Sequence, residues 1–142
     1  MAFIPRGIIP PVVTPTNEDG SFNPVMFDKL LNHLIDNGVH GLFPFGTTGE
    51  FYAFEDDDYR RIITQAVETV NHRVPVYAGA NSITTKGTIR LAKIAKECGA
   101  DALSVLTPMF ISQTQAELYE HYRAIAESTD LPIIIYNNRP KT

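Results

Sequence analysis

The stretch Gly41-Leu42-Phe43-Pro44-Phe45-Gly46-Thr47-Thr48-Gly49-Glu50 decides the fold. It begins as a short apolar run, typical of a buried strand, and ends in two threonines between glycines, with a helix-like acidic segment from Glu55. Glycines allow a tight turn and a close approach of backbone to ligand, and threonines near a helix N-terminus offer hydroxyl and N–H donors. The pattern fits a small carboxylate site, and it also fits a simple βα turn capped by threonine.

Composition limits the classes of protein that the chain can belong to. With 142 residues, of which 44% are apolar, it has the size of one domain with a real core. A net charge of −4 and a pI near 5.5 argue against a nucleic-acid partner. The single cysteine, Cys98, excludes an internal disulfide, and no apolar run approaches the roughly 18 residues that span a bilayer. We therefore expect a soluble cytoplasmic protein.

Five apolar segments recur along the chain with one helical pattern in every gap. They begin near residues 8, 42, 74, 102 and 132, and strands that are apolar throughout indicate a parallel sheet covered by helices. The predicted strands are residues 7–15, 41–45, 74–81, 102–108 and 132–138.

Two architectures have this order, an open doubly wound sheet and part of a (β/α)₈ barrel. No G-x-G-x-x-G follows the first strand, and polar residues follow the strand ends, which favours the barrel. These residues are Thr14, Thr47, Thr48, Asn81, Thr107 and Tyr136. The α/β prediction is a partial TIM barrel, the first four βα units plus strand five, as a single domain over residues 1–142 that does not close.

Capping signals predict where the helices begin. Asn23 followed by Pro24 predicts a helix that ends at Gly38, and Thr114 with Glu117 matches a capping box. The acidic run from Glu55 reads as the first turn of a helix rather than as a metal site. A further helix is predicted over residues 85–98.

Several of these motifs together resemble the dihydrodipicolinate synthase/N-acetylneuraminate lyase family. They are residues 46–50, Val12-Val13-Thr14-Pro15 with Asp19-Gly20 after it, and Tyr136-Asn137, and the resemblance covers about the first half of a family member. It implies a (β/α)₈ barrel, usually a homotetramer, that needs no metal or other cofactor. Such enzymes condense pyruvate with an aldehyde, or run the reverse cleavage, through a Schiff base on a lysine.

The resemblance also implies roles for individual residues. Thr47 and Thr48 would hold the pyruvate carboxylate by hydroxyl and backbone N–H, and Thr48 would join a hydroxyl relay to Tyr136. The Tyr136 phenol would shuttle protons during carbinolamine formation and dehydration. From the residues alone, the favoured interpretation of Tyr136 is a strand-end tyrosine with its ring in the barrel wall and its hydroxyl in solvent.

Three departures from the family pattern leave alternatives open. The family's Schiff-base lysine lies beyond Thr142, so we expect the chain alone to be inactive. Phe110 stands where synthases carry a tyrosine, which leaves a 2-keto-3-deoxy sugar-acid or N-acetylneuraminate-type aldolase beside a synthase acting on aspartate semialdehyde. Lys141 lies in register with an arginine that binds the second substrate, and Arg139 is the alternative. A non-catalytic half-barrel that self-associates through its open edges is the remaining hypothesis.

Overall fold

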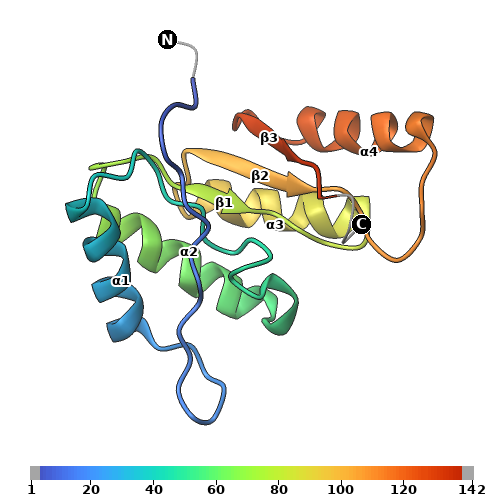
Figure 1. Ribbon diagram of the computed structural model, residues 1–142. Helices are drawn as coiled ribbons and strands as arrows, with labels where there is room; N and C mark the ends of the chain where they lie inside the picture. Colours follow the sequence, from blue (N-terminus) through green and yellow to red (C-terminus); the bar gives the residue numbers. More distant parts are fainter. Residues whose placement is uncertain (1–3, 139–142) are drawn as a thin grey trace.

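The computed structural model describes residues 4–138, and from α2 onward its helices alternate with parallel strands (Figure 1). In chain order the elements are α1 (Pro24–Asp36), η1 (Phe51–Ala53), α2 (Asp56–Val70), β1 (Tyr77–Gly79), α3 (Thr85–Glu97), β2 (Ala102–Leu106), α4 (Gln115–Glu127) and β3 (Ile133–Tyr136). The strands pair in the order β1-β2-β3, and both pairings are parallel. The predicted α/β class with a parallel sheet is therefore confirmed.

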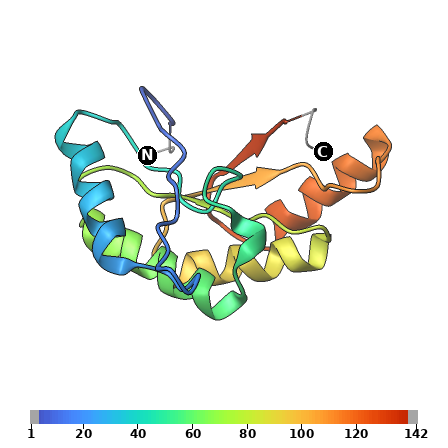
Figure 2. The ribbon, with the colours of Figure 1, turned by 60° about the horizontal axis from the view of Figure 1, so that its bottom comes forward.

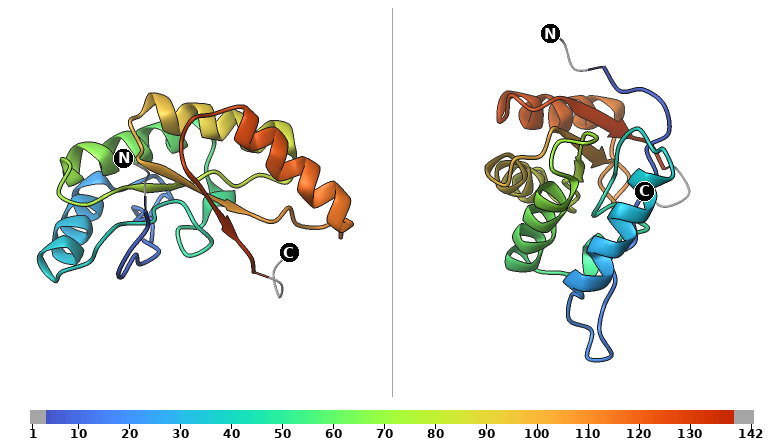
Figure 3. Two further views of the ribbon diagram at one scale, coloured as in Figure 1. Left: turned by 90° about the horizontal axis from the view of Figure 1, so that it is seen from above. Right: turned by 90° about the vertical axis from the view of Figure 1, so that its left-hand side faces the viewer.

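The sheet is curved, and its two faces differ. The four α-helices form an arc over the convex face, and the concave face is left open (Figures 2 and 3). Ser104 of β2 pairs with Gly79 on one side and with Ile134 on the other, while Leu106 pairs with Tyr136. Because the strands are parallel, their carboxyl ends and the loops that follow lie along one edge of the sheet.

The predicted first and second strands, residues 7–15 and 41–45, are corrected by the structure. Only isolated parallel bridges remain there, Pro11 to Phe43 and Leu42 to Val76. The Val12 N–H still donates to the Phe43 carbonyl at 2.9 Å and the Tyr77 N–H to the Leu42 carbonyl at 2.9 Å. Pro10, Pro11 and Pro44 have no N–H to donate, which interrupts the ladder. The two segments keep the position of barrel strands without their regular hydrogen bonding.

The predicted helix starts and stops are confirmed. The Asn23 side chain accepts from the Met26 N–H, and Pro24 is the first residue of α1. Thr114 and Glu117 form both hydrogen bonds of a capping box at the start of α4. Gly38 and Gly99 take positive φ just after α1 and α3, where a left-handed residue ends a helix.

The core lies between the helices and the sheet. The inner faces of α1 and α2 bury Phe27, Leu31 and Ile62, and β2 is buried along its whole length. Burying one such side chain contributes about 1.5–3 kcal/mol. In the part of the chain that the structure describes, no helix is long and apolar enough to cross a membrane. This core fixes the strand ends, and with them the segments that follow.

Candidate functional site

The segment of residues 46–49, here called the threonine corner, is a pair of tight turns. The Gly49 N–H donates to the Gly46 carbonyl at 3.0 Å, and the Glu50 N–H to the Thr47 carbonyl at 3.1 Å. η1 follows, and α2 begins only at Asp56. The expectation that the threonines lie near a helix N-terminus is therefore wrong, because two turns and a 3₁₀ segment intervene.

Long-range contacts hold the corner in place. The Thr14 hydroxyl donates to the Gly49 carbonyl at 2.8 Å, and the Asn81 side-chain amide donates to the Phe45 carbonyl at 3.1 Å. The Phe45 ring packs edge-to-face on Tyr59, with ring centroids 4.7 Å apart. A Cβ at Gly49 would lie 2.9 Å from the Val12 carbonyl oxygen, so only glycine fits this approach.

Thr47, Thr48 and Tyr136 line one cavity of about 330 Å³. The two threonines follow residues 41–45 and Tyr136 ends β3, so the fold brings together side chains that lie far apart in the sequence. Tyr77 and Ser104 also line the cavity, as do Ile9, Pro11, Phe43, Ile134 and Ile135.

The corner carries hydrogen-bond donors that have no acceptor. The Thr47 hydroxyl oxygen is buried and has no partner within residues 4–138. The backbone N–H groups of Thr47 and Thr48 also donate to no acceptor in this part of the chain. Leaving such a group buried and unpaired costs about 1–3 kcal/mol. Three donors on two adjacent residues are suited to a small anion with several oxygen atoms.

Tyr136 reaches the cavity from the end of β3. Its ring packs edge-to-face on Phe43, with centroids 6.1 Å apart, and its hydroxyl accepts from the Asn138 side-chain amide at 3.1 Å. Among the described residues no hydrogen bond joins the Tyr136 and Thr48 hydroxyls. A relay between them would need a water molecule or a substrate oxygen to bridge the two groups. Lys141 and Arg139 lie outside the described residues.

No lysine within residues 4–138 lines this cavity. The four lysines there, Lys29, Lys86, Lys93 and Lys96, are exposed residues of α1 and α3. Lys96 pairs with Asp130 at 2.7 Å. None of them is in a position to form a Schiff base with a molecule in the cavity.

Sequence reasoning missed Tyr77 and Ser104 as residues of the cavity. Both are buried, and burial raises the pKa of Tyr77, with the nearby Asp101 carboxylate adding to the rise. Strand alternation could have indicated these two residues, because every second residue of β1 and β2 faces the same side of the sheet as Ile134. The sequence did not show which side faces the cavity, because the strands are apolar on both faces.

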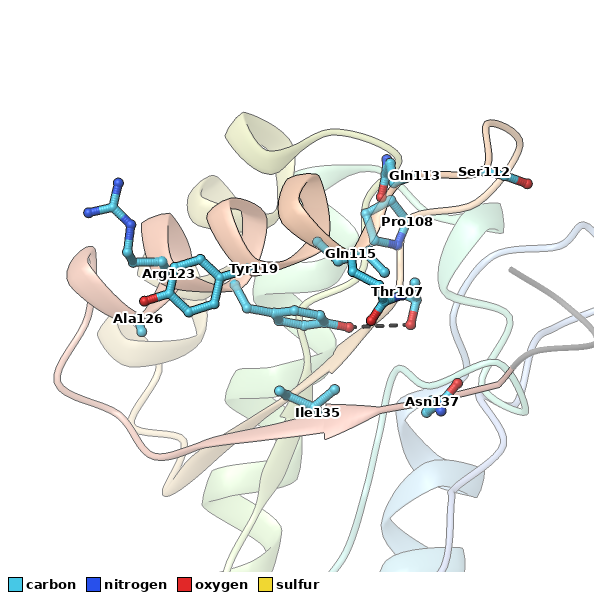
Figure 4. A pocket seen from close by; sticks show the side chains of 12 residues that line it. Thr107, Pro108, Ser112, Gln113, Gln115, Tyr119, Arg123, Ala126, Ile135 and Asn137 are labelled. Carbon is cyan, nitrogen blue, oxygen red and sulfur yellow. Dashed lines mark hydrogen bonds between the residues drawn. The ribbon is translucent and has the colours of Figure 1, made fainter.

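A second cavity of about 850 Å³ lies between α4 and β3 (Figure 4). The Tyr122 hydroxyl donates to the Thr107 hydroxyl oxygen at 3.3 Å there. Ile135, which is 58% exposed, and Tyr119, which is 66% exposed, form part of the lining. Thr47 and Thr48 do not line this cavity. Its apolar lining resembles an uncovered packing surface more than a site for chemistry.

The fold and the site together define a class of protein. Parallel βα units whose polar residues gather at the carboxyl ends of the strands form part of a TIM barrel, and the active sites of such barrels lie at that end. The sequence model of the Dihydrodipicolinate synthetase family matches residues 4–142. The chain belongs to this family, and it covers the N-terminal part of the family barrel.

Two curated relatives are 4-hydroxy-tetrahydrodipicolinate synthases. The chain is 46% identical over 137 residues to the 4-hydroxy-tetrahydrodipicolinate synthase of Chelativorans sp. strain BNC1, covering 96% of this chain and 47% of that protein. The synthase of Agrobacterium fabrum is 42% identical, again with 96% of this chain and 47% of that protein covered. The chain thus spans about half the length of these relatives.

Solved structures are also similar. A dihydrodipicolinate synthase of Bacillus anthracis matches with a TM-score of 0.94 and 37% identity, covering 98% of this chain and 48% of that one. The chloride-inhibited synthase of Acinetobacter baumannii, complexed with pyruvate, matches with a TM-score of 0.93 and 37% identity over 96% and 47% of the two chains. YagE, a prophage protein of Escherichia coli K12 in complex with pyruvate, matches with a TM-score of 0.92 and 34% identity over 96% and 46%.

Proposed function

We propose that this chain is the pyruvate-carboxylate-binding part of a Schiff-base-forming lyase of the 4-hydroxy-tetrahydrodipicolinate synthase type. The complete protein would condense pyruvate with an aldehyde such as aspartate semialdehyde, in the cytoplasm, as a homotetramer and without a cofactor. The chain alone would bind pyruvate and perform no chemistry, because no described lysine reaches the cavity. Two relatives with solved structures bind pyruvate, which supports this substrate.

The unpaired donors of the threonine corner carry the proposal. One carboxylate oxygen of pyruvate would accept from the buried Thr47 hydroxyl, and the other would accept from the N–H groups of Thr47 and Thr48. Hydrogen bonds to an ionised acceptor are worth about 1.5–3 kcal/mol, more than neutral ones. The ligand would also give a partner to a buried hydroxyl that has none within residues 4–138.

Tyr136 would move the protons. Tyr136 lines the same cavity, and a phenol hydroxyl can both donate and accept a hydrogen bond. With the pyruvate carboxylate on the corner, the keto carbon would point away from Thr47 and toward the phenol. The phenol would give a proton to the departing hydroxyl of the carbinolamine, and Thr48 would return one through a bridging oxygen.

The identity of the second substrate depends on residues other than the threonine corner. Lys141 would bind a carboxylate of the aldehyde substrate by charge. Phe110 supports an alternative, a 2-keto-3-deoxy sugar-acid or N-acetylneuraminate-type aldolase, because its side chain has no hydroxyl to pass a proton. A panel of aldehydes with the complete gene product separates these cases. A synthase would prefer aspartate semialdehyde over sugar-derived aldehydes.

Pyruvate titration of the ¹⁵N-labelled chain tests the proposal. The amide signals of Thr47 and Thr48 should shift with saturation, and acetate should shift the same signals less. Borohydride added with pyruvate should leave the mass of the chain unchanged. A stoichiometric lysine adduct, or shifts confined to residues away from the corner, would overturn the assignment.

A self-associating, non-catalytic half-barrel is the second candidate. β3 is an edge strand of the three-stranded sheet, and Ile135 on it is 58% exposed beside the cavity of about 850 Å³. Exposed apolar edges promote association. Sedimentation equilibrium should then show a dimer or larger species that I135K returns to monomer. A monomer at all concentrations would exclude this candidate.

A further inference from the structure

Asn81 is a buried polar residue that lies two positions after the last residue of β1 and is only 4% exposed. Its side-chain amide donates to the Phe45 carbonyl at 3.1 Å, and its side-chain oxygen accepts from the Leu106 N–H at 2.9 Å. Asn81 does not line the cavity that contains Thr47 and Thr48. Its two hydrogen bonds instead connect the residue before the threonine corner to the last residue of β2.

The Phe45–Gly46 peptide, whose carbonyl accepts from Asn81, sets the direction in which the chain enters the threonine corner. Phe45 has a φ of 63°, a left-handed conformation that is unfavourable for a residue with a side chain. Its carbonyl belongs to the peptide plane that it shares with Gly46, so the direction of this carbonyl sets the path of the next residues. A Cβ at Gly79 would lie 2.1 Å from the same oxygen, so the corner also rests closely on β1.

We propose that Asn81 is a positioning residue of the pyruvate site, which fixes the Phe45–Gly46 peptide so that the Thr47 and Thr48 donors face the cavity. The inference rests on the proposed carboxylate-binding role of the corner. Asn81 touches no substrate in this proposal. It acts through Phe45, and it ties the corner to the strand end from which Thr107 and the following loop leave.

Two substitutions at this position separate positioning from simple packing. N81A removes both hydrogen bonds. N81D keeps an acceptor for the Leu106 N–H but, when ionised, places an oxygen without hydrogen against the Phe45 carbonyl. Both variants should bind pyruvate about tenfold or more weakly at pH 7.5, because one or two buried hydrogen bonds are lost. Lowering the pH protonates the N81D side chain, restores a donor and should recover binding in N81D but not in N81A.

T88A is the matched control, because Thr88 is a buried polar residue of α3 that is 1% exposed, and its side chain is not among the groups that hydrogen-bond to residues 45–49. It should leave pyruvate affinity and the Thr47 and Thr48 amide signals unchanged, whatever it does to stability. Ligand-free spectra of N81A and N81D should differ from wild type at residues 45–48.

Unchanged signals at residues 45–48 in both variants, or pyruvate affinities equal to wild type, would overturn the role of Asn81. Failure of the wild-type chain to respond to pyruvate would instead overturn the proposed function. In that case the ligand-free spectra still decide whether Asn81 positions the corner.

Discussion

Replacing Thr47 by valine is expected to stabilise the ligand-free chain while it removes the affinity for pyruvate. The Thr47 hydroxyl is buried with no partner in the described residues, and such a group costs about 1–3 kcal/mol. Valine puts a methyl group in the same volume, so the free energy of unfolding of T47V should rise by about 1 kcal/mol. At a urea m value of about 2 kcal/mol/M, the unfolding midpoint would rise by about 0.5 M.

Two matched variants separate the effect of the Thr47 hydroxyl from the general effect of removing a hydroxyl. T14V removes a hydroxyl that donates to the Gly49 carbonyl at 2.8 Å, so its free energy of unfolding should fall by about 1 kcal/mol. Y59F removes another buried hydroxyl that has no partner among the described residues, and it should stabilise the chain without weakening pyruvate binding. Urea unfolding followed by circular dichroism, with pyruvate titration by NMR, measures all three. The reasoning fails if T47V and T14V shift the midpoint in the same direction, or if T47V binds pyruvate like wild type.

Three further changes test other parts of the structure. Burial lowers the pKa of His121 below its ordinary 6.5, so as the pH falls the unfolded chain takes up a proton at this histidine before the folded chain does. The free energy of unfolding should therefore be highest above pH 6.5 and decrease below it, by at most about 1.4 kcal/mol per pH unit. Urea midpoints between pH 7.5 and 5 measure this slope, which H121L should reduce. G79A should lower the free energy of unfolding by about 3 kcal/mol, because its Cβ would meet the Phe45 backbone carbonyl, which cannot rotate away. G20A should lower it by only about 1 kcal/mol, because Gly20 has open space around it and only its φ of 83° is unfavourable for alanine. An equal midpoint shift in these two would contradict the close approach of Phe45. F110G should raise the melting temperature, because Phe110 has a φ of 78° and an 86% exposed ring; a lower value would show that its ring stabilises the loop.

The helices could be predicted because their signals are local. Asn23 with Pro24, and Thr114 with Glu117, act within one turn of the residue that they cap, and the structure has both caps. The early strands could be predicted only in position. A proline marks the end of a strand in the sequence, but it also lacks the N–H that a strand donates to its neighbour. Whether a regular strand still forms depends on the segment that pairs with it.

The candidate site could be predicted in residue type and not in geometry. The glycines around Thr47 and Thr48 indicated a turn, but the left-handed Phe45 and the bonds from Thr14 and Asn81 are long-range. A polar residue at the end of an apolar strand shows that it lies at the rim of the barrel. It does not show whether its side chain faces the cavity, as Tyr136 does, or faces a neighbouring backbone, as Asn81 does.

An anion site built from unpaired donors must be held open by something else, since a free hydroxyl and free N–H groups would otherwise turn toward protein acceptors. Residues that pack around the corner provide this restraint. The Phe45 ring packs on Tyr59 in the core, and the carbonyls of Phe45 and Gly49 already accept hydrogen bonds from Asn81 and Thr14. The Gly46 and Thr47 carbonyls likewise accept from the N–H groups of Gly49 and Glu50. In the proposed site the three donors have no partner within residues 4–138, so a carboxylate would break none of their hydrogen bonds on entering, and reorganisation of the site would take little from the binding energy.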